Sequence, residues 1–367
     1  MTTKPETKFG GDWARARKAA DAGDVVLSSR VRFARNVSRH VFPGWACDVR
    51  RREVLEKVRK AFRKLGRGKG WMEWGSLPDA ERMRFEERHL VSKEMVEASD
   101  SAGVWVSEDQ RVSVMVNEED HLRIQGLAKG YDLRGAWSLA RETERELAGV
   151  LEFAYSQQLG YLTACPSNVG SGMRASVMVH LAGLALTGGV EASIRGIERM
   201  GYAVRGAGGE DSDSAGEVFQ VSNSGTLGTP ERKVLEDLEE VVDELVQQER
   251  WARQFLREED FVTAEDCVAR ALAVVGAARL MNTSEGMAHL SAIRLGVAAG
   301  MLEGAKPELL DEMMVMIQPA HLARGARDPR ILEQDQETLR DQCRAELMRG
   351  FFAQCGLKMT GKKSRLA

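Results

Sequence analysis

The sequence has little that would tie it to a membrane or to an oxidising compartment. No apolar run approaches the ~18 residues that a membrane-spanning helix needs, and the best one, Ala271 to Ala278, is bounded by Arg270 and Arg279. The first residues contain no apolar core, so they do not read as a signal peptide. The cysteines are few, widely spaced and without a CxxC pair, which excludes a zinc ribbon and argues against a disulfide scaffold; they are Cys47, Cys165, Cys267, Cys343 and Cys355. We therefore expect a cytoplasmic protein.

An excess of one charge is also absent. The 52 basic and 55 acidic residues leave a net charge of -3 on 367 residues, so no global attraction to nucleic acid or to a membrane surface is expected. Hydrophobic residues make up 43% and charged residues 29%, which excludes disordered and fibrous classes. The length corresponds to about two to three domains.

The usual phosphate-binding loops are missing as well. There is no GxxxxGK[ST], and no GxGxxG between a strand and a helix. A nucleotide would then have to be held by arginine, whose guanidinium is permanently charged and binds phosphate oxygens through two N–H groups. The segment SSRVRFARN supplies such side chains, because a strand running on from Asp24 puts Arg30 and Arg32 on one face and Val31 and Phe33 on the other. A solvated strand edge is the alternative.

The predicted secondary structure changes near residue 229. Before it, short strands alternate with helices and glycine-rich turns; the predicted strands are 24–29, 111–120, 159–165 and 217–223. After it the pattern is helical, starting with Thr229 as N-cap and Pro230 in the first turn. Further predicted helices cover 263–281, 284–302, 307–317 and 329–352. We divide the chain into an N-terminal extension (1–23), a mixed domain with a long connecting helix (24–255), a helical domain (256–354) and a basic tail (355–367).

The segment VSVMVNEEDHLRI places polar side chains after an apolar strand. Val112, Val114 and Val116 mark the core face. If the strand continues, the other face carries a polar row, which is how a site is often mounted on a sheet; the row is Asn117, Glu119, His121 and Arg123. A strand that runs out into a charged turn explains the pattern equally well.

The segment YLTACPSNVGSGMRASVMVHL holds the most reactive candidate. Cys165 ends a predicted strand, and a turn through glycines then leads into a predicted amphipathic helix that contains Arg174. A cysteine beside a helix N-terminus and a hydroxyl, here Ser167, is well placed for thiolate stabilisation. A buried, inert cysteine is the alternative.

A glycine-rich loop, VRGAGGEDSDSAG, contains Arg205 and Glu210. Its DSDSAG run lacks ligands for calcium at two required positions, because Ala215 and Ser222 stand there, so we reject a calcium loop. The loop is either a lid over a site or a plain surface loop.

Taken in order, SSRVR, NEEDHLR, CPSNVGSGMRAS and RGAGGE resemble the catalytic domain of the phosphagen (guanidino) kinases, and the whole chain is most similar to bacterial protein-arginine kinases of the McsB type. The resemblance implies an α+β fold, an antiparallel sheet flanked by helices followed by a small all-helical C-terminal domain. It also implies Mg²⁺ and ATP, with a guanidinium as phosphoryl acceptor. Carried over by position, the ATP-binding residues are Ser28, Arg30, Arg32, His89, Arg123, Arg174 and Arg205. The catalytic residues are Glu119, Cys165 and Glu210.

Two features favour an arginine of a protein over free arginine as the acceptor. Only 27 residues precede Ser28, too few for the helical domain that small-molecule phosphagen kinases close over their substrate. The run RDQCRA matches the RDxxRA motif with which McsB-type kinases bind phosphoarginine, which assigns that role to Arg340, Asp341, Arg344 and Ala345. An ordinary charged helix face is the alternative.

The resemblance further implies a role in protein quality control or stress regulation. The expected partners are arginine-containing proteins, an activator protein, a Clp-type protease and a second copy of the chain in a homodimer; neither nucleic acid nor a membrane is expected. A kinase for free arginine or a similar guanidine, and a phosphoarginine-binding adaptor, are the alternatives.

Overall fold

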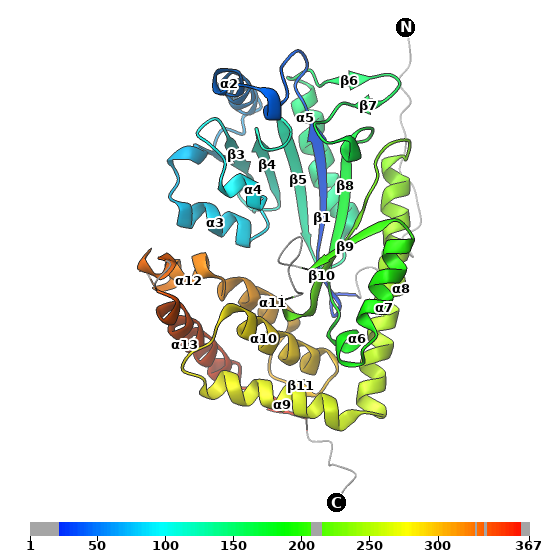
Figure 1. Cartoon of the computed structure of the whole chain (residues 1–367), viewed down its shortest axis with the longest axis vertical. Helices are drawn as coiled ribbons and strands as arrows, with labels where there is room; N and C mark the ends of the chain where they lie inside the picture. Colours follow the sequence, from blue (N-terminus) through cyan, green and yellow to red (C-terminus); the bar gives the residue numbers. More distant parts are fainter. Residues whose placement is uncertain (1–21, 207–214, 327–328, 334–335, 361–367) are drawn as a thin grey trace, which may run out of the picture.

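The computed structural model describes residues 22–206, 215–326, 329–333 and 336–360. Its centre is an eight-stranded antiparallel sheet with the strand order β2-β3-β4-β5-β1-β8-β10-β9 (Figure 1). The strands are β1 (Val26–Arg35), β2 (Trp71–Met72), β3 (Gly103–Val106), β4 (Val112–Val116), β5 (Leu122–Lys129), β8 (Met173–His180), β9 (Tyr202–Gly206) and β10 (Val218–Asn223). A separate small hairpin consists of β6 (Tyr155–Ser156) and β7 (Gly160–Tyr161).

Strand alternation gives this sheet one apolar face. Val31 and Phe33 of β1 and Val177 and Val179 of β8 are fully buried in the main core. That face is covered by helices α2 (Asp48–Lys64), α5 (Leu133–Ala148) and α8 (Glu231–Glu258). The short helices α6 (Ala182–Leu186) and α7 (Val190–Arg199) pack beside α8. The opposite face of β3 and β4 is partly covered by α3 (Asp79–Glu87) and α4 (Lys93–Val96).

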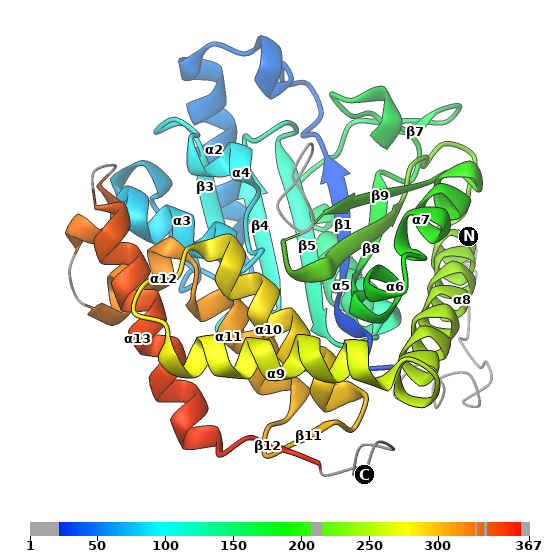
Figure 2. The ribbon, with the colours of Figure 1, turned by 60° about the horizontal axis from the view of Figure 1, so that its bottom comes forward.

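The C-terminal part is helical and lies below the sheet, as Figures 1 and 2 show. It contains α9 (Phe261–Ala277), α10 (Thr283–Ala298), α11 (Pro307–Met316), α12 (Pro319–Ala326) and α13 (Glu337–Cys355), with the two-stranded pair β11 (Leu302–Glu303) and β12 (Lys358–Met359). These helices share a second apolar core that includes Val218 of β10, so the helical part packs directly on the sheet domain. In the described part of the chain, no helix combines the length and apolar character that crossing a bilayer requires. The predicted α+β fold with a helical C-terminal region is confirmed.

Two predictions for the segment that contains Cys165 and Arg174 are wrong. Arg174 lies in strand β8, not in an amphipathic helix, because residues 173–180 alternate between the core and the opposite face with period two. The predicted strand at 159–165 shrinks to β7, and a one-turn 3-10 helix, Pro166–Asn168, follows Cys165. Valine-rich runs with period two favour strands even directly after a glycine-rich turn.

A buried arginine fixes the end of β1 to the loop before β8. Arg35 is fully buried, and its Nε lies 3.0 Å from Oε1 of Glu144 on α5. Its Nη1 donates to the carbonyls of Ala34 and Ser171, and its guanidinium stacks 3.5 Å from the ring centroid of Tyr161. Gly172 has a φ of +62°, and a Cβ there would approach the Ala34 carbonyl to 2.7 Å, so only glycine fits beside this arginine.

We predict that Arg35→Met lowers the free energy of unfolding by about 3 kcal/mol, because it removes the buried guanidinium that bonds Glu144 and the carbonyls of Ala34 and Ser171. The buried Glu144 carboxylate then keeps its ion pair to Arg141 and its hydrogen bond from Tyr161. Urea denaturation measures the change. Arg134→Met is the matched control, since its pair with Glu239 is 2.9 Å long but Arg134 is 56% exposed; it should cost less than about 1 kcal/mol. Equal losses in the two variants would contradict this account.

Candidate active site

The polar face of the sheet carries a cluster of arginines. Arg30 and Arg32 of β1 share it, and Arg32 lies directly opposite Arg174 of β8. On the other side of β1, Arg123 of β5 pairs with Ala34 one step away. Arg205 of β9 reaches the same face, because it pairs with Gln220, which in turn pairs with Met178 opposite Ser28. The register therefore brings the five predicted arginines to one face.

These guanidiniums repel one another. Burial lowers the pKa of Arg30 to about 10, with the charges of Arg123 and Arg174 adding to the effect. Burial and the neighbouring charges of Arg30, Arg123 and Arg174 hold the pKa of Arg32 well below its ordinary value. Since arginine stays charged in proteins, such a cluster is costly unless an anion lies among its members. The arrangement suits a polyphosphate.

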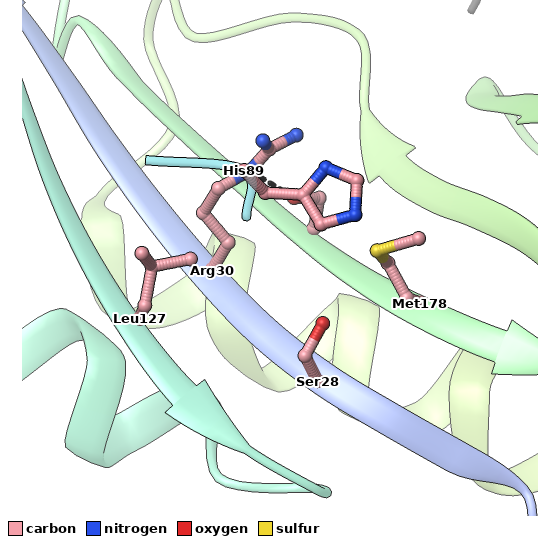
Figure 3. A pocket seen from close by; sticks show the side chains of 6 residues that line it. Ser28, Arg30, His89, Leu127 and Met178 are labelled. Atoms are coloured by element: carbon pink, nitrogen blue, oxygen red, sulfur yellow. Dashed lines mark hydrogen bonds between the residues drawn. The ribbon is translucent and has the colours of Figure 1, made fainter. Parts of the chain in front are cut away.

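A small pocket opens beside these arginines at the Arg30 end of β1. It is lined by Ser28, Arg30, His89, Leu127, Ser176 and Met178 (Figure 3). Arg30 is oriented within it by hydrogen bonds to Ser176 and Gln220. Burial and the charge of Arg30 lower the pKa of His89 to about 4, so its ring is neutral near pH 7. Its lining of apolar side chains next to polar groups has the composition of a small-molecule site.

The predicted polar row is a hairpin and not an extended strand. β4 ends at Val116, Asn117 has a φ of +58°, and its N–H donates to the His121 carbonyl to close the turn before β5. Asn117 and His121 consequently point into the protein: Asn117 donates to the carbonyls of Arg51 and Ser101. Only Glu119 and Arg123 of that row remain at the site.

The two glutamates of the hairpin differ in environment. Glu119 is 42% exposed and accepts from Arg123 Nη2 at 3.2 Å. Burial, with a smaller contribution from Asp120 and Glu118, raises its pKa although Arg123 opposes the shift. Glu118 is nearly buried and accepts at 2.6 Å from both Arg123 and Ser92. Sequence reasoning missed Glu118; its position beside Glu119 and five residues before Arg123 was the available signal.

Buried polar bonds hold the cysteine loop against this hairpin. Asp120 Oδ1 accepts from Asn36 Nδ2 at 2.6 Å and from the Ala164 N–H at 2.7 Å. Ala164 precedes Cys165, whose Sγ lies 2.9 Å from Ser167 Oγ in a half-buried position. The structure thus connects Glu119 and Cys165 through Asp120. Glu210 lies outside the described residues.

The residues of the RDQCRA motif lie on α13. Arg340 Nη1 donates to the carbonyls of Ile331 and Glu333. Arg344 is buried, donates to the carbonyls of Ile317 and Met281, and pairs with Asp341 at 2.8 Å. Ala345 is buried in the helical core. The predicted phosphoarginine residues therefore anchor neighbouring segments in this structure.

The comparisons define the class of protein. The family described as ATP:guanido phosphotransferase, C-terminal catalytic domain, matches residues 53–252. Among solved structures, a lombricine kinase is similar with a TM-score of 0.54 and 25% identity, over 62% of this chain and 67% of that one. The duplicated taurocyamine kinase of Schistosoma mansoni has a TM-score of 0.57 and 25% identity, over 69% of this chain and 37% of that one. The fold and the enzyme class are those of the guanidino kinases.

Sequence relatives narrow the class further. The family described as Protein-arginine kinase McsB C-terminal domain matches residues 262–363. The protein-arginine kinase of Halothermothrix orenii is 40% identical over 300 residues, 82% of this chain and 86% of that one. That of Halalkalibacterium halodurans is 38% identical over 336 residues, 91% of this chain and 93% of that one. The chain belongs to the protein-arginine kinases of the ATP:guanido phosphotransferase family, which confirms the resemblance seen in its sequence.

We predict that Arg32→Ala weakens ATP binding by at least about tenfold, because it removes a cation from the middle of the cluster that we expect to bind the phosphates. Isothermal titration calorimetry at low salt measures the dissociation constant. Arg270→Ala is the control, since Arg270 is 77% exposed on α9; it should leave the constant unchanged. Unaltered affinity in the Arg32 variant would show that the phosphates lie elsewhere.

We also predict that His121 makes the protein sensitive to acid. Burial lowers its pKa to about 4, and its Nδ1 accepts from the Val37 N–H, so the folded state excludes the proton. The unfolded chain binds that proton below its ordinary pKa of 6.5; stability therefore falls as the pH drops from about 6.5 towards 4. Wild type should lose about 2 kcal/mol more than His121→Gln between pH 7 and pH 5 in urea denaturation. Equal losses of unfolding free energy in wild type and in His121→Gln would show that His121 does not cause the sensitivity to acid.

Proposed function

We propose that the chain transfers the γ-phosphoryl group of ATP to arginine side chains of proteins. The observation that carries the proposal is the sheet face on which an arginine cluster adjoins an acidic hairpin and a cysteine loop. The arginines match a polyphosphate donor, and the carboxylate matches a guanidinium acceptor. Phosphoryl transfer between two such groups requires a positively charged donor site next to a negatively charged acceptor site.

We assign the donor site to the arginine face and the adjoining pocket. Arg30, Arg32, Arg123, Arg174 and Arg205 would bind the phosphates. Ser28 and His89 would contact the nucleoside, because they line the pocket with Leu127 and Met178. Fixed cations in a partly desolvated site stabilise the charge that develops on the transferring group.

Magnesium fits this site as a companion of ATP. Mg²⁺ usually keeps several waters and binds through phosphates with one or two carboxylates. Among the described residues, no group of three or more His, Cys, Asp or Glu side chains is placed to hold a metal ion. Glu118, at the edge of the arginine face, is a carboxylate that could hold it. When bound, Mg²⁺ neutralises charge on the phosphates.

The acceptor step needs alignment and a base. A nitrogen of the guanidinium attacks the γ-phosphorus in line, the bond from that phosphorus to the bridging oxygen breaks, and ADP leaves with those electrons. The proton lost from the guanidinium passes to a carboxylate, for which Glu119, with its raised pKa, is positioned. Glu210 would be the second carboxylate. Cys165 would contact the guanidinium electrostatically and carry no phosphoryl group.

The helical domain would bind the product. We propose that Arg340, Asp341, Arg344 and Ala345 recognise phosphoarginine, with Arg340 the residue that exchanges its backbone carbonyls for a phosphate. The proposal extends to the domain boundaries at 24–255 and 256–354, a cytoplasmic homodimer, an activator protein and a Clp-type protease as partners, and a role in protein quality control or stress regulation.

We predict that Glu119→Gln reduces phosphoryl transfer by at least about 100-fold, since the amide cannot accept the guanidinium proton. Cys165→Ala should reduce it by at least about tenfold through loss of the charge contact. The assay combines Mg-ATP, free arginine and an arginine-rich protein. Mass spectrometry near neutral pH detects phosphoarginine, because the N–P bond is acid-labile.

Glu108→Gln and Cys267→Ala are matched controls away from the site, and both should transfer at the wild-type rate. Excess free arginine should barely slow labelling of the protein substrate. Phosphate found only on free arginine would replace the proposal by a small-molecule guanidino kinase. Wild-type rates in both site variants would refute the assignment of the acceptor residues.

A further inference from the structure

A short strap links the helical domain to the nucleotide pocket. It comprises residues 87–92, from the last residue of α3 to the N-cap of α4, and begins where α3 meets α12 (Figures 1 and 2). His89, which lines the pocket, stands in its middle. Each end of the strap is bonded to a different part of the molecule.

The first end holds the helical domain. The Glu87 carboxylate accepts from the backbone N–H groups of Ala320 and His321 at 2.7 and 3.0 Å, so it caps the first turn of α12. Its Oε2 also lies 2.5 Å from Nδ1 of His321, and both side chains are at least 94% buried. The other ring nitrogen of His321 accepts from Arg88 Nε at 3.0 Å, which assigns the proton to Nδ1.

The middle of the strap has an uncommon backbone conformation. His89 has a φ of +58°, which costs a non-glycine residue about 1 kcal/mol and persists only where neighbours impose it. The buried Gln125 of β5 donates to the His89 carbonyl at 2.7 Å. With Glu87 and Arg88 bonded to His321 on one side, the backbone is held so that the imidazole lies in the pocket beside Arg30.

The far end reaches the hairpin. Ser92 Oγ donates to Glu118 at 2.6 Å, and the same carboxylate oxygen accepts from Arg123. Thus one six-residue segment contacts α12, the nucleotide pocket and the carboxylate that orients an arginine of the cluster.

We propose that Glu87 and His321 are positioning residues for the nucleotide. The bonds of Glu87 to His321 and to the first turn of α12 fix the strap. The strap in turn places His89 in the pocket and, through Ser92 and Glu118, places Arg123. This inference rests on the proposed binding of ATP at the arginine face. Neither side chain touches the reacting atoms. The helical domain is therefore a structural part of the ATP site, in addition to its proposed role in binding phosphoarginine.

The test measures KM for ATP, KM for the protein acceptor and kcat in the full chain. His321→Ala should raise KM for ATP about fivefold or more, with kcat and the acceptor KM changed less than about twofold. His321→Asn should restore most of the ATP affinity, because its amide nitrogen can occupy the position of Nδ1 and donate to Glu87. Glu87→Gln should resemble His321→Ala, and the double variant should be no worse than either single one.

The control is His289→Ala, which removes the other histidine–glutamate pair of the helical domain, 3.7 Å from Glu285 on the same helix and without a bond to the strap. It should leave KM for ATP unchanged. An unchanged KM for ATP in His321→Ala, or an equal rise in the control, would overturn the inference while leaving the kinase proposal intact. Wild-type protein that neither binds nor consumes ATP would instead overturn the proposed function itself.

Discussion

Repulsion among arginines on one sheet face is the constraint around which this structure is organised. The antiparallel register sets Arg32 directly opposite Arg174, and Arg30 and Arg123 stand one step away. Gathering these cations costs free energy, which carboxylates at the margin offset in part. Glu118 supplies part of the compensation within the protein through its 2.6 Å bond to Arg123. In the function that we propose, the polyphosphate of ATP would supply the rest.

The acidic side of the site depends on buried bonds of a different kind. The buried side chains of Asn36, Asp120 and His121 connect the end of β1, the hairpin and the cysteine loop. Arg35, the last residue of β1, likewise connects Glu144 to the loop at Ser171. These largely buried contacts hold in place the loops that carry Glu119 and Cys165, and alignment is what the proposed phosphoryl transfer requires of them.

Much of the fold and part of the site could be predicted from the sequence. Alternation on β1 placed Arg30 and Arg32 correctly, since period-two geometry follows from the backbone alone. The sequence pattern was misleading in two other places. A helix is predicted for residues 173–180 although they alternate with period two, and their place in the middle of the sheet depends on long-range pairing with β1 and β10. The turn at Asn117 also escaped the pattern, and with it the structural roles of Asn117 and His121. The contact between Glu87 and His321 spans 234 positions, which no periodicity reveals.

The most direct test of this account is a crystal structure of the protein with ADP, Mg²⁺, nitrate and an arginine-containing peptide, in which planar nitrate takes the place of the transferring phosphoryl group. The account predicts the diphosphate and nitrate among Arg30, Arg32, Arg123 and Arg174, with the peptide guanidinium between Glu119 and Cys165. Nucleotide bound away from the arginine face, or a guanidinium that contacts neither Glu119 nor Cys165, would contradict it.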